Sequence, residues 1–394
     1  MEPDHKPKQV KRQKEGERRA MSTFDCIVIG TGGVGSAALY YLARRGARVL
    51  GLDRFPPGHD RGSSHGDTRI IRLAYFEHPD YVPLLRRAYE LWAELEASCG
   101  QQLYREVGLV QIGAPDGEVV PGVLRSAREH NLKVTSLSPS EFARRLPGFR
   151  LPETMNAVFE QNAGYLAVEA CVRSYASEAQ KLRAELRSDE TVLSWQADGN
   201  SVMVKTDRQE YHAARLVITP GAWAPQFLAD LGIRFEIRRK SLFWYEAPAV
   251  YHADQHCPAF LYETPAGIFY GYPQIDEWGL KVAEHSGGQV IHDPLHVDRN
   301  INPRDRAQVE DFLGQDLPGV SRTLRKHVVC MYTMSPDSHF VVDHHPQHPH
   351  VAFVAGLSGH GFKFTSVLGE ILADLTLDGR TNLPIGFLRS DRLR

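Results

Sequence analysis

Two stretches near the end of the sequence carry side chains that could do chemistry on a bound molecule. Residues 330–337 read CMYTMSPD and begin with the thiol of Cys330, and residues 356–364 read GLSGHGFKF and place Lys363 after a glycine-rich loop. A thiol can form a covalent bond, and a lysine can hold an anion. From the residues alone two simpler interpretations stay open, because a buried cysteine is usually an apolar filler and a glycine-rich loop is usually a turn.

Basic side chains recur in two other places. Arg69 and Arg72 lie three residues apart in a polar, glycine-punctuated run. In a helix or turn this spacing places both on one face, where two guanidiniums could bind a carboxylate. The alternative is a solvated loop whose arginines pair with surface acids. In a later predicted strand, Lys281 and His285 would point to the same side, either toward a cavity or toward solvent at a sheet edge.

These groups need a framework, and the N-terminal part of the chain predicts one. An apolar run over residues 24–29 leads into a GxGxxG pattern, then into a predicted helix over 36–45. A second predicted strand over 47–52 ends at Asp53. A strand, glycine turn, helix, strand and acid in this order form a dinucleotide-binding unit.

Each glycine of this pattern has a physical reason. Gly30 permits a tight turn, Gly32 lets the backbone approach a pyrophosphate, and Gly35 lets the helix pack close to the strand. The amides at the helix N-terminus would then face the phosphates, and Asp53 would bind a ribose. The pattern does not choose FAD over NAD.

The remaining chain predicts a second, more antiparallel region. Residues 81–96 form an amphipathic helix, and the stretches 238–245 and 267–273 are rich in aromatic and β-branched residues typical of a sheet. A predicted strand over 216–219 runs into a turn at Trp223, where a second loop could approach a cofactor. We therefore expect an α/β protein with two interleaved regions.

Composition narrows the class of protein. The 394 residues carry a formal net charge of -2, which gives no case for nucleic acid or an anionic membrane as partner. No run approaches the roughly 18–20 apolar residues that cross a bilayer. Five scattered cysteines favour a reducing compartment, so we expect a cytoplasmic protein. The charged residues 1–20 lack the apolar core of a signal peptide and are predicted to be a disordered tail.

At these residues the sequence resembles the monomeric sarcosine oxidase and N-methyltryptophan oxidase family of flavoenzymes. The resemblance runs from about Phe24 to the C-terminus and rests on the glycine pattern, GSSHGDTRIIR at 62–72, the YVPL run, CMYTMSPD and GLSGHGFKF. Residues 285–292, HSGGQVIH, look more like the N-methyltryptophan oxidase branch. The segments expected to set side-chain size match neither branch, so the substrate stays open.

The resemblance implies an oxidase of secondary, N-methyl amino acids whose FAD is attached through a cysteine thioether, at Cys330. It implies hydride transfer from the N-methyl carbon to the flavin, release of formaldehyde and a primary amino acid, and reduction of oxygen to hydrogen peroxide. The alternatives are an oxidase of cyclic secondary amino acids such as proline or pipecolate, a dehydrogenase that passes electrons to a carrier, and a non-catalytic nucleotide-binding protein.

The resemblance also implies roles for single residues. Lys281 and Arg69 would lie beside the reactive edge of the flavin, and Arg72 and Lys363 would hold the substrate carboxylate. The expected cavity residues are Tyr270, His285, Tyr332 and His360, of which His285 and Tyr332 are also candidate catalytic residues. The expected cofactor contacts are Gly30, Gly32, Gly33, Gly35, Asp53, Ser64, His65, Arg69, Trp223, Cys330, Gly359, Gly361 and Lys363. No metal site is expected.

With the resemblance, the expected architecture is a Rossmann-like FAD-binding domain interleaved with an α+β substrate domain that carries a mostly antiparallel sheet. The predicted FAD-binding segments are 21–80, 155–235 and 330–394, and the predicted substrate segments are 81–154 and 236–329. The resemblance further implies a monomer.

Overall fold

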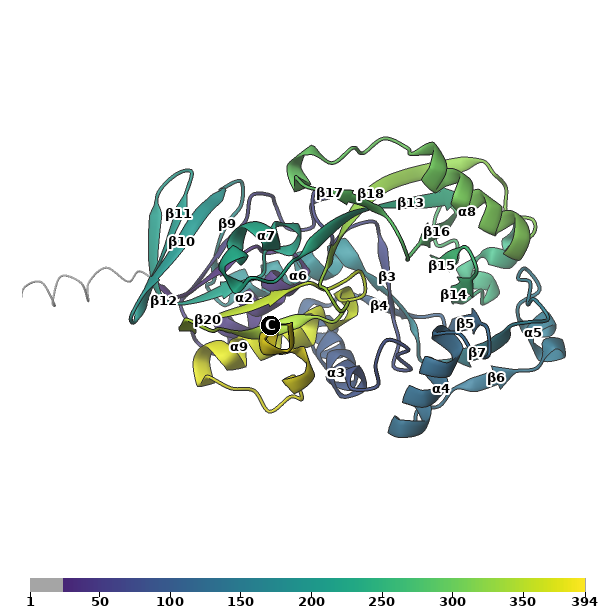
Figure 1. Ribbon diagram of the computed structural model, residues 1–394, viewed down its shortest axis with the longest axis horizontal. Coiled ribbons are helices and arrows are strands. Elements are labelled where there is room, and N and C mark those ends of the chain that lie inside the picture. The colour runs from purple at the N-terminus through teal and green to yellow at the C-terminus, as the bar shows by residue number, and fades with distance from the viewer. Residues whose placement is uncertain (1–23, 394) are drawn as a thin grey trace, which may run out of the picture.

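The computed structural model describes residues 24–393, whose strands form three sheets. Figure 1 shows the first sheet and its helices in one half of the molecule and most of the second sheet in the other half. The chain passes between the halves several times, so each half contains segments that are far apart in the sequence. The predicted α/β architecture with interleaved regions is confirmed. Residues 1–20, predicted to be a disordered tail, lie outside the described residues.

The first sheet has a parallel centre. Strand β1 (Phe24–Ile29) lies between β2 (Val49–Leu52) and β12 (Glu210–Ile218). One half of β12 pairs with β11 (Ser201–Thr206) and the other half pairs in parallel with β20 (His348–Ala355). Five of the six residues of β1 are buried, as expected for a parallel strand covered on both faces. The outer strands are β9 (Glu185–Arg187), β10 (Val192–Asp198) and β19 (Val341–His345).

Four helices share a core with this sheet. They are α2 (Gly33–Arg44), α3 (Tyr81–Cys99), α6 (Val168–Lys181) and α9 (Thr365–Asp378). Helix α2 is buried from Gly33 to Ala43 because α6 and α9 both pack against it. This burial explains why its sequence lacks the polar stripe of a surface helix. The sheet has a second core that includes the short helix α7 (Ala224–Phe227).

The second sheet has nine strands within the described chain, and it is mostly antiparallel. The one parallel pair joins β5 to β14, and β18 runs antiparallel to β13 along nearly its whole length. The strands are β5 (Leu109–Gly113), β6 (Thr135–Leu137), β7 (Asn156–Glu160), β13 (Glu236–Tyr245), β14 (Ala259–Thr264), β15 (Gly267–Tyr272), β16 (Leu280–Glu284), β17 (Gln289–Ile291) and β18 (Leu324–Met334).

The third sheet has three strands and contains Arg69. Strand β3 (Thr68–Ile71) and strand β4 (Tyr104–Glu106) both pair with β8 (Gly164–Ala167). The remaining α-helices of the described residues are α4 (Val119–His130), α5 (Pro139–Arg145) and α8 (Pro303–Asp316). Single 3₁₀ turns include η1 (Gly221–Trp223), η6 (Phe362–Phe364) and η8 (Ser390–Leu393).

Three elements do not lie in the half of the molecule to which the predicted domain boundaries assign them. Helix α3 packs in the core of the first sheet, because its apolar stripe covers α9 and α6. Strand β7 pairs with β5 and β6 in the second sheet. Strand β18 crosses the predicted boundary at residue 330, and Cys330 pairs with Lys240 of β13, so the thiol belongs to the second sheet.

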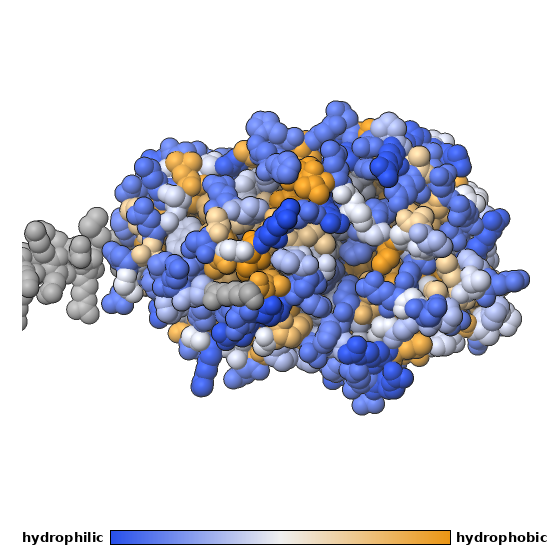
Figure 2. Space-filling view, in the orientation of Figure 1, coloured by the Kyte–Doolittle hydropathy of each residue, from blue (hydrophilic) through white to orange (hydrophobic). Residues whose placement is uncertain are grey.

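Within residues 24–393, no helix is long and apolar enough to cross a bilayer. Figure 2 shows a mostly hydrophilic face on which hydrophobic residues form small separate patches. Such scattered exposure is normal for a folded domain.

Candidate active site

A cavity of about 180 Å³ lies at the carboxyl ends of four parallel strands. Its wall includes Ile29 at the end of β1, Leu52 at the end of β2, Thr219 just after β12 and Ala355 at the end of β20. In open α/β sheets this edge is where ligands bind. The predicted cofactor residues in its wall are Gly30, Gly32, Gly33, Asp53, Ser64, Arg69, Trp223, Gly359 and Gly361.

The glycine turn brings the N-terminus of α2 to this cavity. Gly30 has a φ of +82°, and a Cβ there would lie 2.5 Å from the carbonyl oxygen of Thr219. A Cβ at Gly35 would overlap the carbonyl oxygen of Gly30, so the helix approaches the strand only because both residues are glycines. Gly32 precedes the helix without a side-chain cap, which leaves amides of the first turn available to an anion.

Two polar side chains frame this helix end. The Gly33 amide donates to Ser64 Oγ at 3.2 Å. The carboxylate of Asp53 accepts from the Thr31 amide at 2.6 Å and from the Phe55 amide at 3.0 Å. These bonds fix Asp53 at the cavity wall, where the GxGxxG pattern predicts a ribose ligand.

A second cavity, of about 50 Å³, adjoins the first. Both are lined by Arg69, Tyr332, Gly359 and Phe362, so the two spaces meet at these residues. The other predicted residues in the smaller cavity are Arg72, Tyr270, His285, His360 and Lys363. Of residues 285–292, which looked more like the N-methyltryptophan oxidase branch, only His285 lines either cavity.

Arg72 is buried in the wall of the smaller cavity, so the interpretation of a solvated surface pair is wrong. Its guanidinium bonds both oxygens of Glu77, at 2.6 and 2.7 Å. Burial alone would raise the pKa of Glu77, but Arg72, His360 and Lys363 lower this pKa to about 2. The Nε of Arg72 has no hydrogen-bond partner among the described residues. A buried donor without a partner is available to a ligand.

Lys363 supplies a second cation to the smaller cavity. Its Nζ donates to the His360 carbonyl oxygen at 2.7 Å. Burial lowers the pKa of Lys363 to about 7, and Arg72 adds to this effect while Glu77 opposes it. With Arg69, which lines the same cavity, three cations stand against the one carboxylate of Glu77, and the net positive charge suits an anionic ligand.

The two histidines of the smaller cavity are uncharged at neutral pH. Burial lowers the pKa of His285 to about 3 and that of His360 to about 4. His285 Nδ1 lies 3.4 Å from the hydroxyl of Tyr332, which connects strand β18 to the residue that follows β16. Burial also raises the pKa of Tyr332 well above its ordinary value, so its hydroxyl stays protonated.

Lys281 is buried on β16, which lies between β13 and β15, so the alternative of a solvated sheet edge is wrong. Its Nζ donates to the Thr68 carbonyl at 2.8 Å and also to the Gly66 carbonyl. It lies 4.7 Å from the ring centroid of Tyr272, a wall residue of the smaller cavity. Burial and the nearby Arg69 hold the pKa of Lys281 well below its ordinary value.

Cys330 is buried beside the same arginine. Arg69 donates from its guanidinium to Cys330 Sγ at 3.2 Å and to the Ser63 carbonyl at 3.0 Å. Met331 and Tyr332, which follow Cys330 on β18, line the larger cavity. His65 is buried too, and burial together with Arg69 lowers its pKa to about 3. Cys330, His65, Gly35 and Lys281 lie behind the cavity walls rather than in them.

Comparison with known proteins identifies the family. The model of the family described as FAD dependent oxidoreductase matches residues 25–375. The chain belongs to this family. It is 43% identical over 378 residues to a monomeric sarcosine oxidase from Streptomyces avermitilis, covering 94% of this chain and 98% of that protein. It is 36% identical over 373 residues to an N-methyl-L-tryptophan oxidase from Yersinia pestis, covering 94% and 100%.

Solved structures agree on the fold. NikD, described as an unusual amino acid oxidase essential for nikkomycin biosynthesis, matches with a TM-score of 0.81 at 24% identity over 94% of this chain and 98% of its own. L-proline dehydrogenase from P. horikoshii matches with a TM-score of 0.81 at 21% identity and the same coverage. At these identities the likeness shows the fold of this FAD-dependent oxidoreductase.

The residues present fit FAD. A dinucleotide needs a binding site for its phosphates and a long cavity for the rest of the molecule. The wall of the larger cavity runs from the uncapped helix N-terminus at Gly32, which can bind phosphate, to Arg69 and Tyr332. The sequence interpretation missed several residues of the smaller cavity, among them Glu77 and Tyr272. Strand alternation from Tyr270 would have predicted Tyr272, since residues two apart share a face. For Glu77 the only signal is an acid five residues after an arginine.

Proposed function

We propose that this FAD-dependent oxidoreductase is an oxidase of N-methyl amino acids. The substrate would lose two electrons and two protons to give a carbon–nitrogen double bond. Water would hydrolyse this bond to formaldehyde and a primary amino acid, and oxygen would be reduced to hydrogen peroxide. The observation that carries the proposal is the junction of a dinucleotide-type cavity with a smaller cavity that holds Arg72 and Lys363.

In this proposal Arg72 and Lys363 bind the substrate carboxylate, and so orient the N-methyl carbon toward the larger cavity. Orientation of this kind lowers a reaction barrier by several kcal/mol in favourable cases, about 7 or more. The substrate amine must be uncharged to give up a hydride. Three cations, Arg69, Arg72 and Lys363, line the smaller cavity and disfavour a further positive charge there. The uncharged His285 and His360, with Tyr270 and Tyr332, would line the space around the amine.

Arg69, and Lys281 when it is protonated, would supply positive charge beside the reacting centre. When bound, FAD supplies the hydride acceptor and the site of oxygen reduction. Both steps develop negative charge, and preorganised cations stabilise such charge without reorganisation. Lys281 is held by backbone carbonyls and Arg69 by the Ser63 carbonyl, so their positions are fixed before the substrate arrives.

We also propose that Cys330 carries FAD through a thioether bond. The S–H bond of the thiol and one C–H bond of the flavin would break, and oxygen would take up the two electrons and two protons released. The support is its burial next to Arg69 and its place one residue before the cavity wall. Acid precipitation of the purified protein tests it: a covalent cofactor leaves a yellow pellet, and a white pellet under a yellow supernatant contradicts the bond. Cys330→Ser should release the flavin. Cys257→Ser, which changes a buried thiol in the core of the second sheet, is the matched control and should retain it.

Peroxide release from sarcosine, N-methyltryptophan, proline and pipecolate tests the activity. The smaller cavity has about 50 Å³ against about 180 Å³ for the larger, and the relatives at 40–43% identity are sarcosine oxidases. We therefore expect sarcosine to be turned over faster than N-methyltryptophan. Turnover of proline or pipecolate alone would favour a cyclic substrate, and no turnover of any of the four would contradict the proposal.

We propose a monomer in the cytoplasm. None of the five cysteines, all of which fall within residues 24–393, forms a disulfide, and this supports a reducing compartment. The relatives named monomeric sarcosine oxidase support the monomer. Light scattering on the eluting protein would test it, because a dimer would have twice the mass of 44.3 kDa.

A further inference from the structure

We propose that Tyr75 is a positioning residue: its ring holds Arg72 and Lys363 together, and its hydroxyl is locked by His360. Tyr75 is fully buried and lies behind the walls of both cavities. It would therefore act on the substrate only through the two cations. The inference rests on the proposed function, since it explains how the positive charges of Arg72 and Lys363 can lie together in the binding site of the substrate carboxylate.

The ring of Tyr75 faces both cations. Arg72 Cζ lies 4.4 Å from its centroid, and Lys363 Nζ lies 5.1 Å from the same centroid. Both distances fall within the roughly 6 Å range of a cation–π interaction. A single buried aromatic ring thus attracts the two groups whose charges repel each other.

A ring serves this purpose better than a second carboxylate would. Glu77 already neutralises part of the charge, but its oxygens occupy the guanidinium of Arg72 and compete with an incoming carboxylate. The negative face of Tyr75 attracts the cations through its quadrupole and leaves their N–H groups for the ligand. Arg72 Nε keeps no partner among the described residues, as a group reserved for a ligand would.

Hydrogen bonds fix the ring in place. The Tyr75 hydroxyl lies 2.6 Å from His360 Nδ1, and His360 Nε2 lies 3.0 Å from the Ser338 carbonyl oxygen. A carbonyl only accepts, so Nε2 carries the proton and Nδ1 accepts from the tyrosine. Lys363 Nζ donates to the carbonyl of the same histidine, which ties the cation and the ring to one residue.

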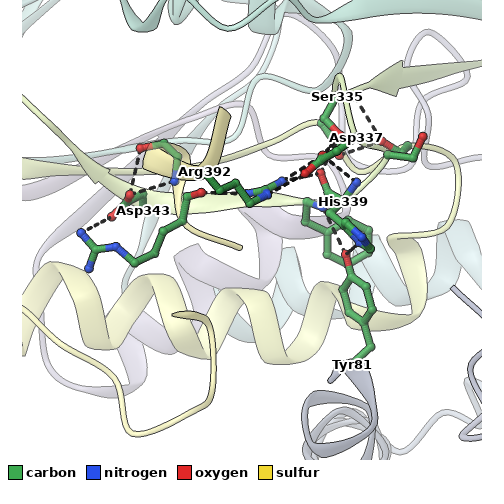
Figure 3. A network of polar contacts seen from close by, with 12 residues as sticks. Tyr81, Ser335, Asp337, His339, Asp343 and Arg392 are labelled. Atoms are coloured by element: carbon green, nitrogen blue, oxygen red, sulfur yellow. Dashed lines mark hydrogen bonds and ion pairs between the residues drawn. The ribbon is translucent and has the colours of Figure 1, made fainter. Parts of the chain in front are cut away.

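The loop that carries Ser338 is itself held by the C-terminal segment. Figure 3 shows Arg392 paired with Asp337, at 2.8 Å, and the Asp337 carboxylate accepts from the His339 amide at 3.1 Å. The hydroxyl of Tyr81 lies 3.3 Å from His339 Nδ1. The contacts that fix Tyr75 therefore continue through His360 and the loop of Ser338 to Arg392 near the surface.

Stepwise weakening of the cation–π attraction of the ring tests the positioning role of Tyr75 without a large change in the shape of the side chain. The probe is propionate, a carboxylate without an amine, whose affinity for the holoenzyme is read from the flavin spectrum. We expect Tyr75→Phe to bind it within about threefold of wild type. Phenylalanines with one, two and three ring fluorines at position 75 should weaken binding stepwise, by about tenfold in all, because each fluorine reduces the negative face.

Two further measurements separate positioning from packing. Weakening the ring should also move the pH at which propionate binding is lost to lower values, because Lys363 would lose its proton more easily. Tyr175→Leu, a change in the same core at a tyrosine bonded to Tyr41, should lower the melting temperature without changing propionate affinity.

Two results would overturn the inference. Affinity that does not depend on the number of fluorines would mean that Tyr75 only fills the core. No propionate binding by wild-type holoenzyme at any pH would overturn the proposed carboxylate seat itself, and the inference with it.

Discussion

Replacing Glu77 by glutamine should destabilise the fold by about 3 kcal/mol at neutral pH. The side chain is 13% exposed and bonds Arg72 through both oxygens. Its pKa is about 2 in the folded protein against an ordinary 4.5. At about 1.4 kcal/mol for each pH unit, this difference corresponds to about 3 kcal/mol. Breaking one partner out of a buried ion pair gives a similar figure, about 3–5 kcal/mol.

The sign of the pH dependence follows from the lowered pKa. A carboxyl whose pKa is lower in the folded state stabilises the fold fully above about pH 4.5, and the contribution is lost as the pH falls toward about 2. Calorimetric melting of wild type and Glu77→Gln should therefore show a gap in melting temperature at pH 7 that shrinks below pH 4.5. Glu94→Gln is the control, because Glu94 pairs with Arg44 at the surface and such pairs contribute about 1 kcal/mol or less.

The same change should strengthen binding of a small carboxylate. Without Glu77 the guanidinium of Arg72 has no protein competitor, so propionate affinity should rise about tenfold at pH 6, where Lys363 still carries its proton. The reasoning is refuted if Glu77→Gln melts like wild type at pH 7 and binds propionate with unchanged affinity.

Three more outcomes are expected. Propionate affinity of the wild type should fall as the pH rises through about 7, because Lys363 loses its proton there, and Lys363→Met should flatten this profile. Lys281→Met should slow the reaction of the reduced enzyme with oxygen about 100-fold in stopped flow, with a smaller effect on anaerobic reduction by substrate; an unchanged oxygen rate would contradict the assigned role. Gln111→Leu should raise stability by about 1 kcal/mol in thermal melting, since the amide is fully buried and neither of its polar atoms has a partner among the described residues. A lower melting temperature would mean that the amide is paired.

Local sequence patterns predicted the dinucleotide-binding unit well. The apolar run before Gly30, the glycines and Asp53 lie within 30 residues, and each acts through backbone geometry that its own residue type dictates. The amphipathic period predicted helix α3 but not the surface it covers, because a stripe of apolar residues fits any complementary core.

The smaller cavity was less predictable. Lys281 and Arg72 left alternatives open because a charged side chain in a strand or loop is usually solvated, and only the tertiary structure buries them. Tyr75 follows Arg72 by three residues and carries no motif. Its position matters only because Lys363, 288 residues later, packs over the same ring.

The order of strands in the first sheet constrains how the protein can be made. Strand β12 pairs on one side with β1, which is synthesised before it, and on the other with β20, which is synthesised after it and ends at Ala355. At about 5–20 residues per second, roughly a quarter of a minute to a minute separates the two. The wall of the larger cavity is therefore incomplete until β20 has been synthesised. Capture of the cofactor in this cavity must therefore wait for strand β20.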